Sequence, residues 1–272
     1  MNQETLIRRA NPTLEDAAAL LVVERASLGD SPYDAAQALA VMRRPEHAEY
    51  LACPASDPRQ AVGFCSCLET PTAQGLCLEI DMLGVIAAYR GQGLATRLIV
   101  QAVGEARARG VRRFRALVAV DNRASQRAFE RAGFAASATA FDLLLYRLDG
   151  LTPVAFLPSN WRWAIDAADD SPAETHRLYD ATGDLVAMAE CLHVQTLAYN
   201  GLWLERLDLS APEAERAMAR ALVERAKSLA LDEVGYVAPT GDDEASDDLA
   251  HAAFIREGYQ VVGRYLVLVA EG

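Results

Sequence analysis

The segment that most constrains the fold is a short glycine-rich stretch between two apolar elements. Residues 85–98 read VIAAYRGQGLATRL, and Arg90, Gly91 and Gly93 separate an apolar run over 77–86 from a helical pattern over 93–109. The apolar stripe of that helix recurs at four-residue spacing and consists of Leu94, Leu98, Ala102 and Ala106. We therefore expect a strand, a tight loop and a helix in direct succession.

The segments on either side extend this unit to the element order β-α-α-β-β-β-α-β-α-β. Strands are predicted over 5–10, 49–54, 61–69, 77–86, 112–120 and 141–148, and helices over 11–28, 31–44, 93–109 and 122–134. Thr13 is the expected N-cap of the first helix, in a capping box with Asp16. Ser31 is the expected cap of the second, with Pro32 at its first helical position.

The chain is long enough for two domains, and its second half partly echoes its first. AFERAGF at 128–134 resembles AFIREGY at 253–259, and LEIDMLGV at 78–85 resembles LWLERLDL at 202–209, at offsets of 125 and 124. Residues 151–160, with two prolines and almost no charge, are expected to be a linker between domains over 1–150 and 161–272. Only about 23 residues separate the start of the linker from the strand near Glu174, so the second copy has no room for both early helices.

Charge and cysteine usage exclude several classes of function. Residues 1–150 carry 17 acidic and 17 basic side chains and residues 151–272 carry 21 and 9, so the net charge of −12 lies in the second half and disfavours nucleic acid. Five cysteines without a C-x-x-C spacing predict neither disulfides nor a metal site. Without a signal peptide or a membrane-length apolar run, we expect a cytoplasmic protein that does not bind membranes.

The glycine loop and its context resemble the GNAT N-acetyltransferase superfamily. The family motif R/Q-x-x-G-x-G/A is matched by Arg90, Gly93 and Ala95, Asn122 opens the next helix, and AFERAGF resembles the family's A-x-x-x-Y-x-x-x-G-F segment. The resemblance implies an α/β (α+β) fold of two GNAT-like domains, each with a mixed, mostly antiparallel sheet flanked by helices.

The resemblance also implies that acetyl-CoA is the acyl donor. The free N–H groups at the start of the helix and the two glycines suit a diphosphate, and the pantetheine arm would lie along the preceding strand. The expected cofactor residues are Leu83, Val85, Arg90, Gly91, Gln92, Gly93, Leu94, Ala95, Thr96, Asn122 and Phe129. Arg123 or Arg127 could neutralise the 3′-phosphate, or the arginines could form a solvated surface.

Acetyl transfer to an amine needs a proton acceptor, and the resemblance points to Glu79 on the fourth strand. Strand alternation would place Asp81 on the same face, where a second carboxylate raises the pKa of the first. The alternative is that both acids lie on a solvated strand edge. The family's usual general acid, a tyrosine, is replaced by Phe129. Water, Ser125, Tyr89 or Tyr146 would then protonate the departing thiolate.

The second copy departs from the motif where the cofactor would bind. Ala214, Glu215, Ala217 and Ala219 stand opposite Arg90, Gly91, Gly93 and Ala95, and the acidic run GDDEASDD stands opposite Asn122. We expect a degenerate, non-catalytic domain and, in a monomer, an intramolecular pseudo-dimer. The predicted function is acetyl transfer to an amine of a small molecule or peptide. The alternatives are an acyl-CoA-binding sensor or scaffold and, more specifically, a mycothiol synthase-like enzyme.

Overall fold

The computed structural model describes residues 4–29, 31–72, 74–148, 158, 160–168, 171–210, 212–240 and 247–272. These residues form two compact units. Unit 1 comprises residues 1–138, 196–198 and 266–272, and unit 2 comprises residues 139–195 and 199–265. Most of the expected linker over 151–160 and most of the acidic run over 241–248 lie outside the described residues.

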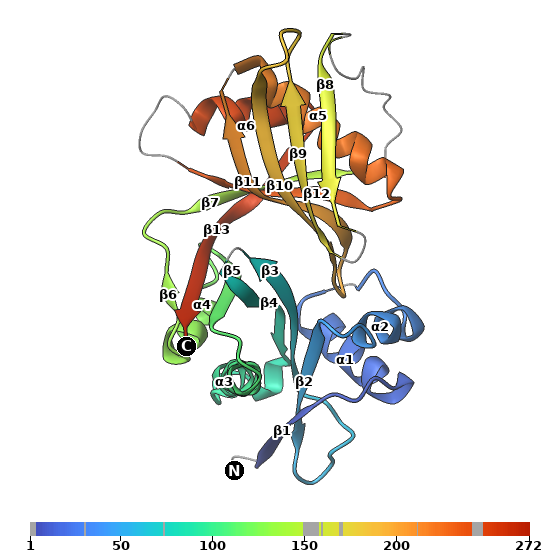
Figure 1. Cartoon of the computed structure of the whole chain (residues 1–272). Coiled ribbons are helices and arrows are strands. Elements are labelled where there is room, and N and C mark those ends of the chain that lie inside the picture. Colours follow the sequence, from blue (N-terminus) through green and yellow to red (C-terminus); the bar gives the residue numbers. More distant parts are fainter. Residues whose placement is uncertain are drawn as a thin grey trace. The chain divides into compact units, whose positions relative to one another are not determined.

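Unit 1 contains the predicted elements up to the last strand, with one added turn of 3-10 helix and one added short strand (Figure 1). Its sheet has the order β1-β2-β3-β4-β5-β13, with β6 paired to β13, and the β4–β5 pair is parallel. The elements are β1 (Thr5–Arg9), α1 (Leu14–Ser27), α2 (Ala35–Met42), β2 (His47–Pro54), β3 (Gly63–Thr72), β4 (Gly75–Val85), η1 (Ala87–Tyr89), α3 (Leu94–Ala108), β5 (Arg113–Ala119), α4 (Arg123–Arg131) and β6 (Ala135–Ala136).

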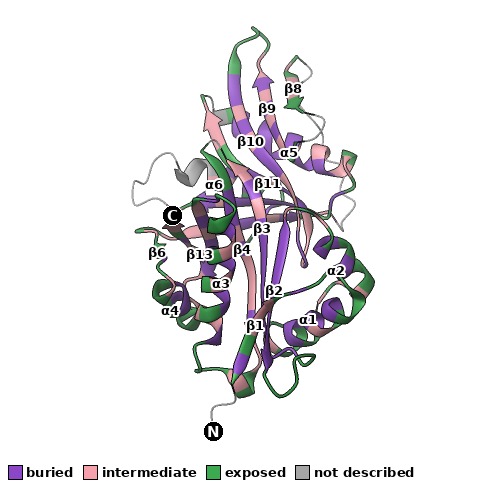
Figure 2. Ribbon diagram, turned by 60° about the horizontal axis from the view of Figure 1, so that its bottom comes forward, coloured by how far each residue is buried: buried purple, intermediate pink, exposed green. Residues whose placement is uncertain are grey.

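Helices cover both faces of the unit 1 sheet, and β2 therefore has buried residues along its whole length (Figure 2). Tyr50 points into the core beneath α3 and α4, whereas Leu51 points into the core beneath α1 and α2. Leu197, from the loop that follows β10, is fully buried in this second core. That burial explains why residues 196–198 belong to unit 1.

The last strand of unit 1 comes from the C-terminus of the chain. The segment that the sequence predicted as the final strand of the first half, β7 (Phe141–Arg147), lies in unit 2, where it pairs with β12 and β13. Strand β13 (Gln260–Glu271) begins in unit 2, and its residues from Leu266 onward belong to unit 1. There Leu268 is fully buried, and Arg107 Nη2 donates to Glu271 O at 3.0 Å. The sequence prediction placed residues 139–148 in the first domain, over 1–150, whereas in the structure they belong to unit 2.

Unit 2 repeats the later elements of unit 1 and lacks counterparts of α1 and α2. Its sheet order is β13-β7-β12-β11-β10-β9-β8, and only residues 168–172 separate β8 from β9, too few for two helices. The elements are β8 (Arg162–Ala167), β9 (Ala173–Tyr179), β10 (Leu185–Gln195), β11 (Asn200–Leu209), α5 (Pro212–Ser228), β12 (Glu233–Pro239) and α6 (Asp247–Arg256). The fold expected from the sequence, two sheet-and-helix units, is confirmed.

The two units share a β-bulge at equivalent positions. In β4 the register against β3 shifts so that Asp81 has no Cα partner, and in β11 the register against β10 shifts so that Glu205 has none. These two residues lie 124 residues apart, which is the offset between the echoed sequences. Because a bulge is a specific local feature, its recurrence supports an internal duplication.

Two predicted helix caps need correction. Thr13 caps α1 by accepting from Asp16 N, but the Asp16 carboxylate binds Arg8 and Asn11 N instead of completing a capping box. Helix α2 begins later than expected, after Asp34, which forms a capping box with Gln37. The Asp34 carboxylate accepts two N–H bonds there, whereas the predicted cap, Ser31, accepts from Tyr33 N in the preceding turn.

Candidate active site

The glycine loop turns the chain from β4 into α3 with two left-handed residues. Gly91 has φ of 75°, and Gly93, the N-cap of α3, has φ of 76°. A Cβ at either position would meet no protein atom within 4 Å. Packing within the protein therefore does not require glycine here. The backbone conformation does, and the space in front of the first turn of α3 is open to a ligand.

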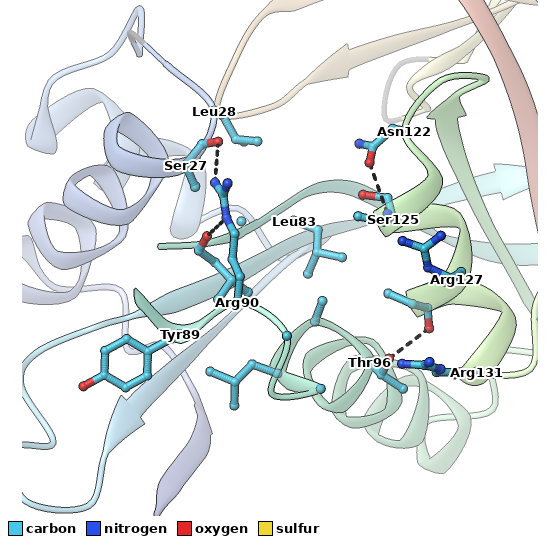
Figure 3. Close-up of a pocket in the computed structure, with 18 residues that line it drawn as sticks. Ser27, Leu28, Leu83, Tyr89, Arg90, Thr96, Asn122, Ser125, Arg127 and Arg131 are labelled. Atoms are coloured by element: carbon cyan, nitrogen blue, oxygen red, sulfur yellow. Dashed lines mark hydrogen bonds between the residues drawn. The ribbon is translucent and has the colours of Figure 1, made fainter. Parts of the chain in front are cut away.

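That space belongs to a cavity of about 450 Å³ in unit 1 (Figure 3). Nine of the eleven predicted cofactor residues line it: Leu83, Val85, Arg90, Gly91, Gly93, Leu94, Ala95, Thr96 and Asn122. The other lining residues are Ser27, Leu28, Gly84, Tyr89, Ala124, Ser125, Arg127, Ala128 and Arg131. Residues from α1, β4, α3 and α4 thus converge on one cavity.

The cavity lies where β4 and β5 separate. Their parallel pairing covers Cys77–Glu79 against Arg113–Arg115, and no further pair follows. Strand β4 stays paired with β3 as far as Val85, opposite Gly63. Beyond Glu79, β4 is therefore no longer paired with β5, and Leu83, Gly84 and Val85 line the cavity there.

Arg90 fastens the loop to both neighbouring elements. Its Nε donates to Val85 O at 2.9 Å, and its Nη2 donates to Ser27 O, at the end of α1, at 3.4 Å. The guanidinium group therefore also positions the wall of the cavity, in addition to the positive charge that the sequence predicted for it. Ser27 and Leu28 also form part of this wall, and no pattern in the sequence indicates it.

The opposite wall is the first two turns of α4. Asn122 caps this helix by accepting from Ser125 N at 3.1 Å. Arg127 and Arg131 lie one turn apart and line the cavity (Figure 3), and within the described ranges neither has an ion pair or hydrogen bond. Arg123 does not line the cavity, and its Nη1 donates to Gln126 Oε1 at 3.0 Å.

Two of the predicted cofactor residues are not among those that line the cavity. Gln92 is exposed, and its side-chain nitrogen donates to Ala88 O at 3.4 Å. Phe129 is buried on the core side of α4 and packs edge-on against Phe134, with ring centroids 5.1 Å apart.

The two predicted catalytic carboxylates lie on β4 outside the cavity lining. Arg115 Nε donates to both carboxylate oxygens of Glu79 at 2.9 Å, and Thr70 Oγ1 donates to Oε1 at 3.0 Å. The bulge at Asp81 interrupts the strict alternation of side chains along β4, on which the prediction that Glu79 and Asp81 share one face relied. As a result Leu83 packs against the same core as Ile80, although strict alternation would place them on opposite faces.

Unit 2 has an ion network where unit 1 has its open cavity. In unit 1, Thr96 Oγ1 of α3 donates to Ala128 O of α4 at 3.2 Å. In unit 2, Arg216 and Arg220 of α5 both bind the buried carboxylate of Glu257, just after α6. Glu257 stands at the position of Ala132 in the echoed segments. These two arginines are thus paired within the chain, unlike Arg127 and Arg131.

The described residues contain neither a metal-binding cluster nor a helix that could span a membrane. No group of three or more His, Cys, Asp or Glu side chains there has the arrangement of a metal site. In the same part of the chain, no helix is both long enough and apolar enough to cross a membrane.

Comparison with known proteins identifies the family. The model of the acetyltransferase (GNAT) family matches residues 16–134, which include the loop, the cavity and both β4 carboxylates. Residues 16–134 are therefore a GNAT acetyltransferase domain. This domain is an acetyltransferase by family, and the acyl donor that GNAT enzymes use is acetyl-CoA. No curated protein matches the sequence.

Solved structures extend the likeness to the whole chain. A GCN5-related N-acetyltransferase from Sphaerobacter thermophilus has a TM-score of 0.64 at 14% identity, covering 98% of this chain and 95% of that one. A tandem GNAT protein from the clavulanic acid biosynthesis pathway has a TM-score of 0.57 at 14% identity, covering 98% of each chain. A putative acetyltransferase from Pyrococcus horikoshii has a TM-score of 0.58 at 11% identity, covering 100% and 91%. Over almost its whole length the chain thus has the fold of these proteins, which is consistent with a tandem arrangement.

Proposed function

We propose that unit 1 transfers an acetyl group from acetyl-CoA to a primary amine of a small molecule or peptide, and that unit 2 is catalytically silent. The observation that carries the proposal is the cavity that opens between β4 and β5 in front of the α3 N-terminus. A helix N-terminus behind two left-handed glycines suits a diphosphate, and the part of β4 that is no longer paired with β5 suits the amides of a pantetheine arm.

The residues present fit this cofactor on both walls. The first-turn N–H groups of α3 would hold the diphosphate, because the open space at Gly91 and Gly93 lets it approach the backbone. Arg127 and Arg131 would hold the 3′-phosphate, since they line the cavity without a partner in the described part of the chain. When bound, acetyl-CoA supplies the acetyl group as a thioester. The sequence prediction named Arg123 or Arg127 for this phosphate. Only Arg127 of the two lines the cavity, and Arg131 lines it as well.

The amine must be neutral when it attacks, so a group of the chain has to take its proton. We assign this role to Glu79, with Arg115 and Thr70 fixing the orientation of its carboxylate. Glu79 precedes Leu83, which lines the cavity, by four residues, or roughly 13 Å along a strand. It would therefore act through water. Asp81, at the bulge between these residues, is the second candidate.

We assign the protonation of the thiolate to water or to one of two side chains that remain from the sequence prediction. Phe129 carries no proton donor, and Tyr146 belongs to unit 2. Ser125 and Tyr89 line the cavity and therefore remain candidates for the proton donor. The missing tyrosine at position 129 is also the observation that favours the alternative function, a non-catalytic acyl-CoA-binding sensor or scaffold.

A thiol-release assay tests the proposal. Acetyl-CoA is incubated with the full chain and with single members of a panel of monoamines, diamines, amino acids, aminoglycosides and peptide N-termini, and free CoA is measured together with the acetylated product. Turnover with at least one amine supports the transferase. Stabilisation by acetyl-CoA in a thermal-shift experiment, without turnover of any amine, would support the sensor instead.

A further inference from the structure

Strand β8 forms the outer edge of the unit 2 sheet (Figure 1). Among the described residues its only neighbouring strand is β9, with which it pairs from Arg162, opposite Tyr179, to Ala167, opposite Glu174. The outer side of an edge strand presents a row of backbone N–H and C=O groups with which a further strand can pair. Natural proteins usually protect such an edge, so the way in which β8 is protected is informative.

The common protective features are missing from β8. The strand contains no proline and no lysine, and its register against β9 runs without a bulge. None of its residues is buried, although three consecutive ones, Trp163, Ala164 and Ile165, are apolar. In β9, by contrast, every second residue is buried. Strand β8 therefore has the properties of an edge that pairs with another strand rather than those of an edge that prevents pairing.

The sequence of β8 is complementary to itself in the antiparallel direction. Residues 162–166 read RWAID. When two copies pair antiparallel about Ala164, Arg162 of one copy lies opposite Asp166 of the other, and Trp163 lies opposite Ile165. Side chains that lie directly opposite share a face of the sheet and interact. The pairing thus forms two opposite-charge pairs and two aromatic–aliphatic pairs, whereas a parallel pairing in register would bring like charges together.

Both charged side chains are accessible to a second copy. Arg162 is exposed, and its guanidinium group lies over the ring of Tyr179, 3.9 Å from the ring centroid. The Asp166 carboxylate binds Arg177 of β9 and is still 69% exposed. Because a carboxylate can accept several hydrogen bonds at once, Asp166 has capacity for a second guanidinium group.

An edge strand of unit 1 gives a useful contrast. Strand β1, with the sequence TLIRR, carries two arginines and no acidic residue. Pairing of β1 with a second copy of itself would therefore form no opposite-charge pair. In addition, Arg97 Nη2 donates to Thr5 O at 2.7 Å, so one carbonyl of β1 has a partner within the chain. Charge complementarity thus distinguishes β8 from β1.

We propose that two copies of the chain associate through β8, which pairs antiparallel with β8 of the second copy about a two-fold axis at Ala164. The interface is isologous, so the contact between Arg162 and Asp166 occurs twice in each dimer. A single pair of short strands buries less surface than a typical stable interface, and the dimer should therefore dissociate on dilution, with a Kd of about micromolar size. This inference does not depend on the proposed function of unit 1.

Sedimentation equilibrium of the full chain, at concentrations on both sides of about 1 µM, tests the proposal. The wild type should dimerise at the high end and dissociate at the low end. Arg162→Asp and Asp166→Arg should each raise Kd about tenfold or more, because each replaces two attractive pairs with two like-charge pairs. The double variant carries the same charges in exchanged positions, so its Kd should return to within about threefold of the wild-type value.

Arg206→Asp is the matched control, since it reverses an exposed arginine on β11, away from the edge, and should leave Kd unchanged. Thermal denaturation with similar Tm values checks that every variant is folded. A chain that stays monomeric at all concentrations would overturn the proposal. A dimer with unchanged Kd in both single variants would do the same, because it would use another surface. If the double variant dimerises no better than the single variants, the two charges do not face each other and the proposed register is wrong.

Discussion

Arg115 holds Glu79 at two points, with its Nε 2.9 Å from each carboxylate oxygen. The contact spans the last paired position of β4 and β5. Beyond it the two strands separate and the cavity begins. The ion pair therefore lies where the two strands begin to separate. It also fixes the orientation of the carboxylate that we assign as the general base.

Replacing Glu79 with glutamine should lower kcat by about a hundredfold, the usual range for loss of a general base. KM for acetyl-CoA should change little, because Glu79 does not line the cavity. Steady-state kinetics of thiol release with the best amine checks this. Asp81→Asn is the comparison, and full activity in Glu79→Gln together with loss in Asp81→Asn would move the base to Asp81.

Alanine substitutions at one glycine of the loop and at one glycine elsewhere should distinguish an effect on stability from an effect on cofactor binding. Gly93→Ala and Gly110→Ala both place a side chain at a positive φ, 76° and 95°, and neither Cβ would meet an atom within 4 Å. Both should therefore lose about 1 kcal/mol of stability. Only Gly93→Ala should raise KM for acetyl-CoA, because Gly110 does not line the cavity. Equal KM values in the two variants would refute a diphosphate site at this loop.

The two unpaired arginines should recognise the 3′-phosphate. Arg127→Ala combined with Arg131→Ala should raise KM for acetyl-CoA about tenfold or more and leave KM for 3′-dephospho-acetyl-CoA nearly unchanged. Arg123→Ala, which removes a charge outside the cavity, serves as control. A similar rise with both cofactors would place the arginines at a different part of the molecule.

Unit 2 should lose stability in acid through Glu174. Hydrogen bonds from His176 and Arg225 outweigh the effect of burial and lower the pKa of this carboxyl from 4.5 to about 2. The resulting stabilisation, about 3 kcal/mol, is present above pH 4.5 and is lost as the pH falls towards 2. Thermal denaturation of wild type and Glu174→Gln should thus differ at pH 7 and converge near pH 2. A difference in Tm that is independent of pH would contradict this assignment.

The loop and its neighbours were predictable because local chemistry determines them. Gly91, Gly93 and Asn122 adopt the roles that their types favour, a left-handed turn and a helix cap. The duplication was visible in the echoed segments, and the bulges at Asp81 and Glu205 recur at the same offset. Patterns within a few residues, and repeats of these patterns, thus predict most of the cofactor residues that line the cavity.

Long-range partners were not predictable in the same way. The alternation along β7 indicates a strand but does not say which sheet it joins, so its place in unit 2 and the use of Leu268 in unit 1 were missed. The contact of Arg90 with Ser27 joins residues 63 positions apart, and no local pattern signals it.

Calorimetric titration of the full chain with acetyl-CoA tests most directly whether unit 1 alone carries the site. One molecule should bind per chain, and Gly93→Asp, which places a negative charge at the α3 N-terminus, should abolish this binding. Glu215→Gln, at the corresponding helix of unit 2, should leave both the stoichiometry and the affinity unchanged. Binding of two molecules per chain, or a single site that survives Gly93→Asp, would contradict the account.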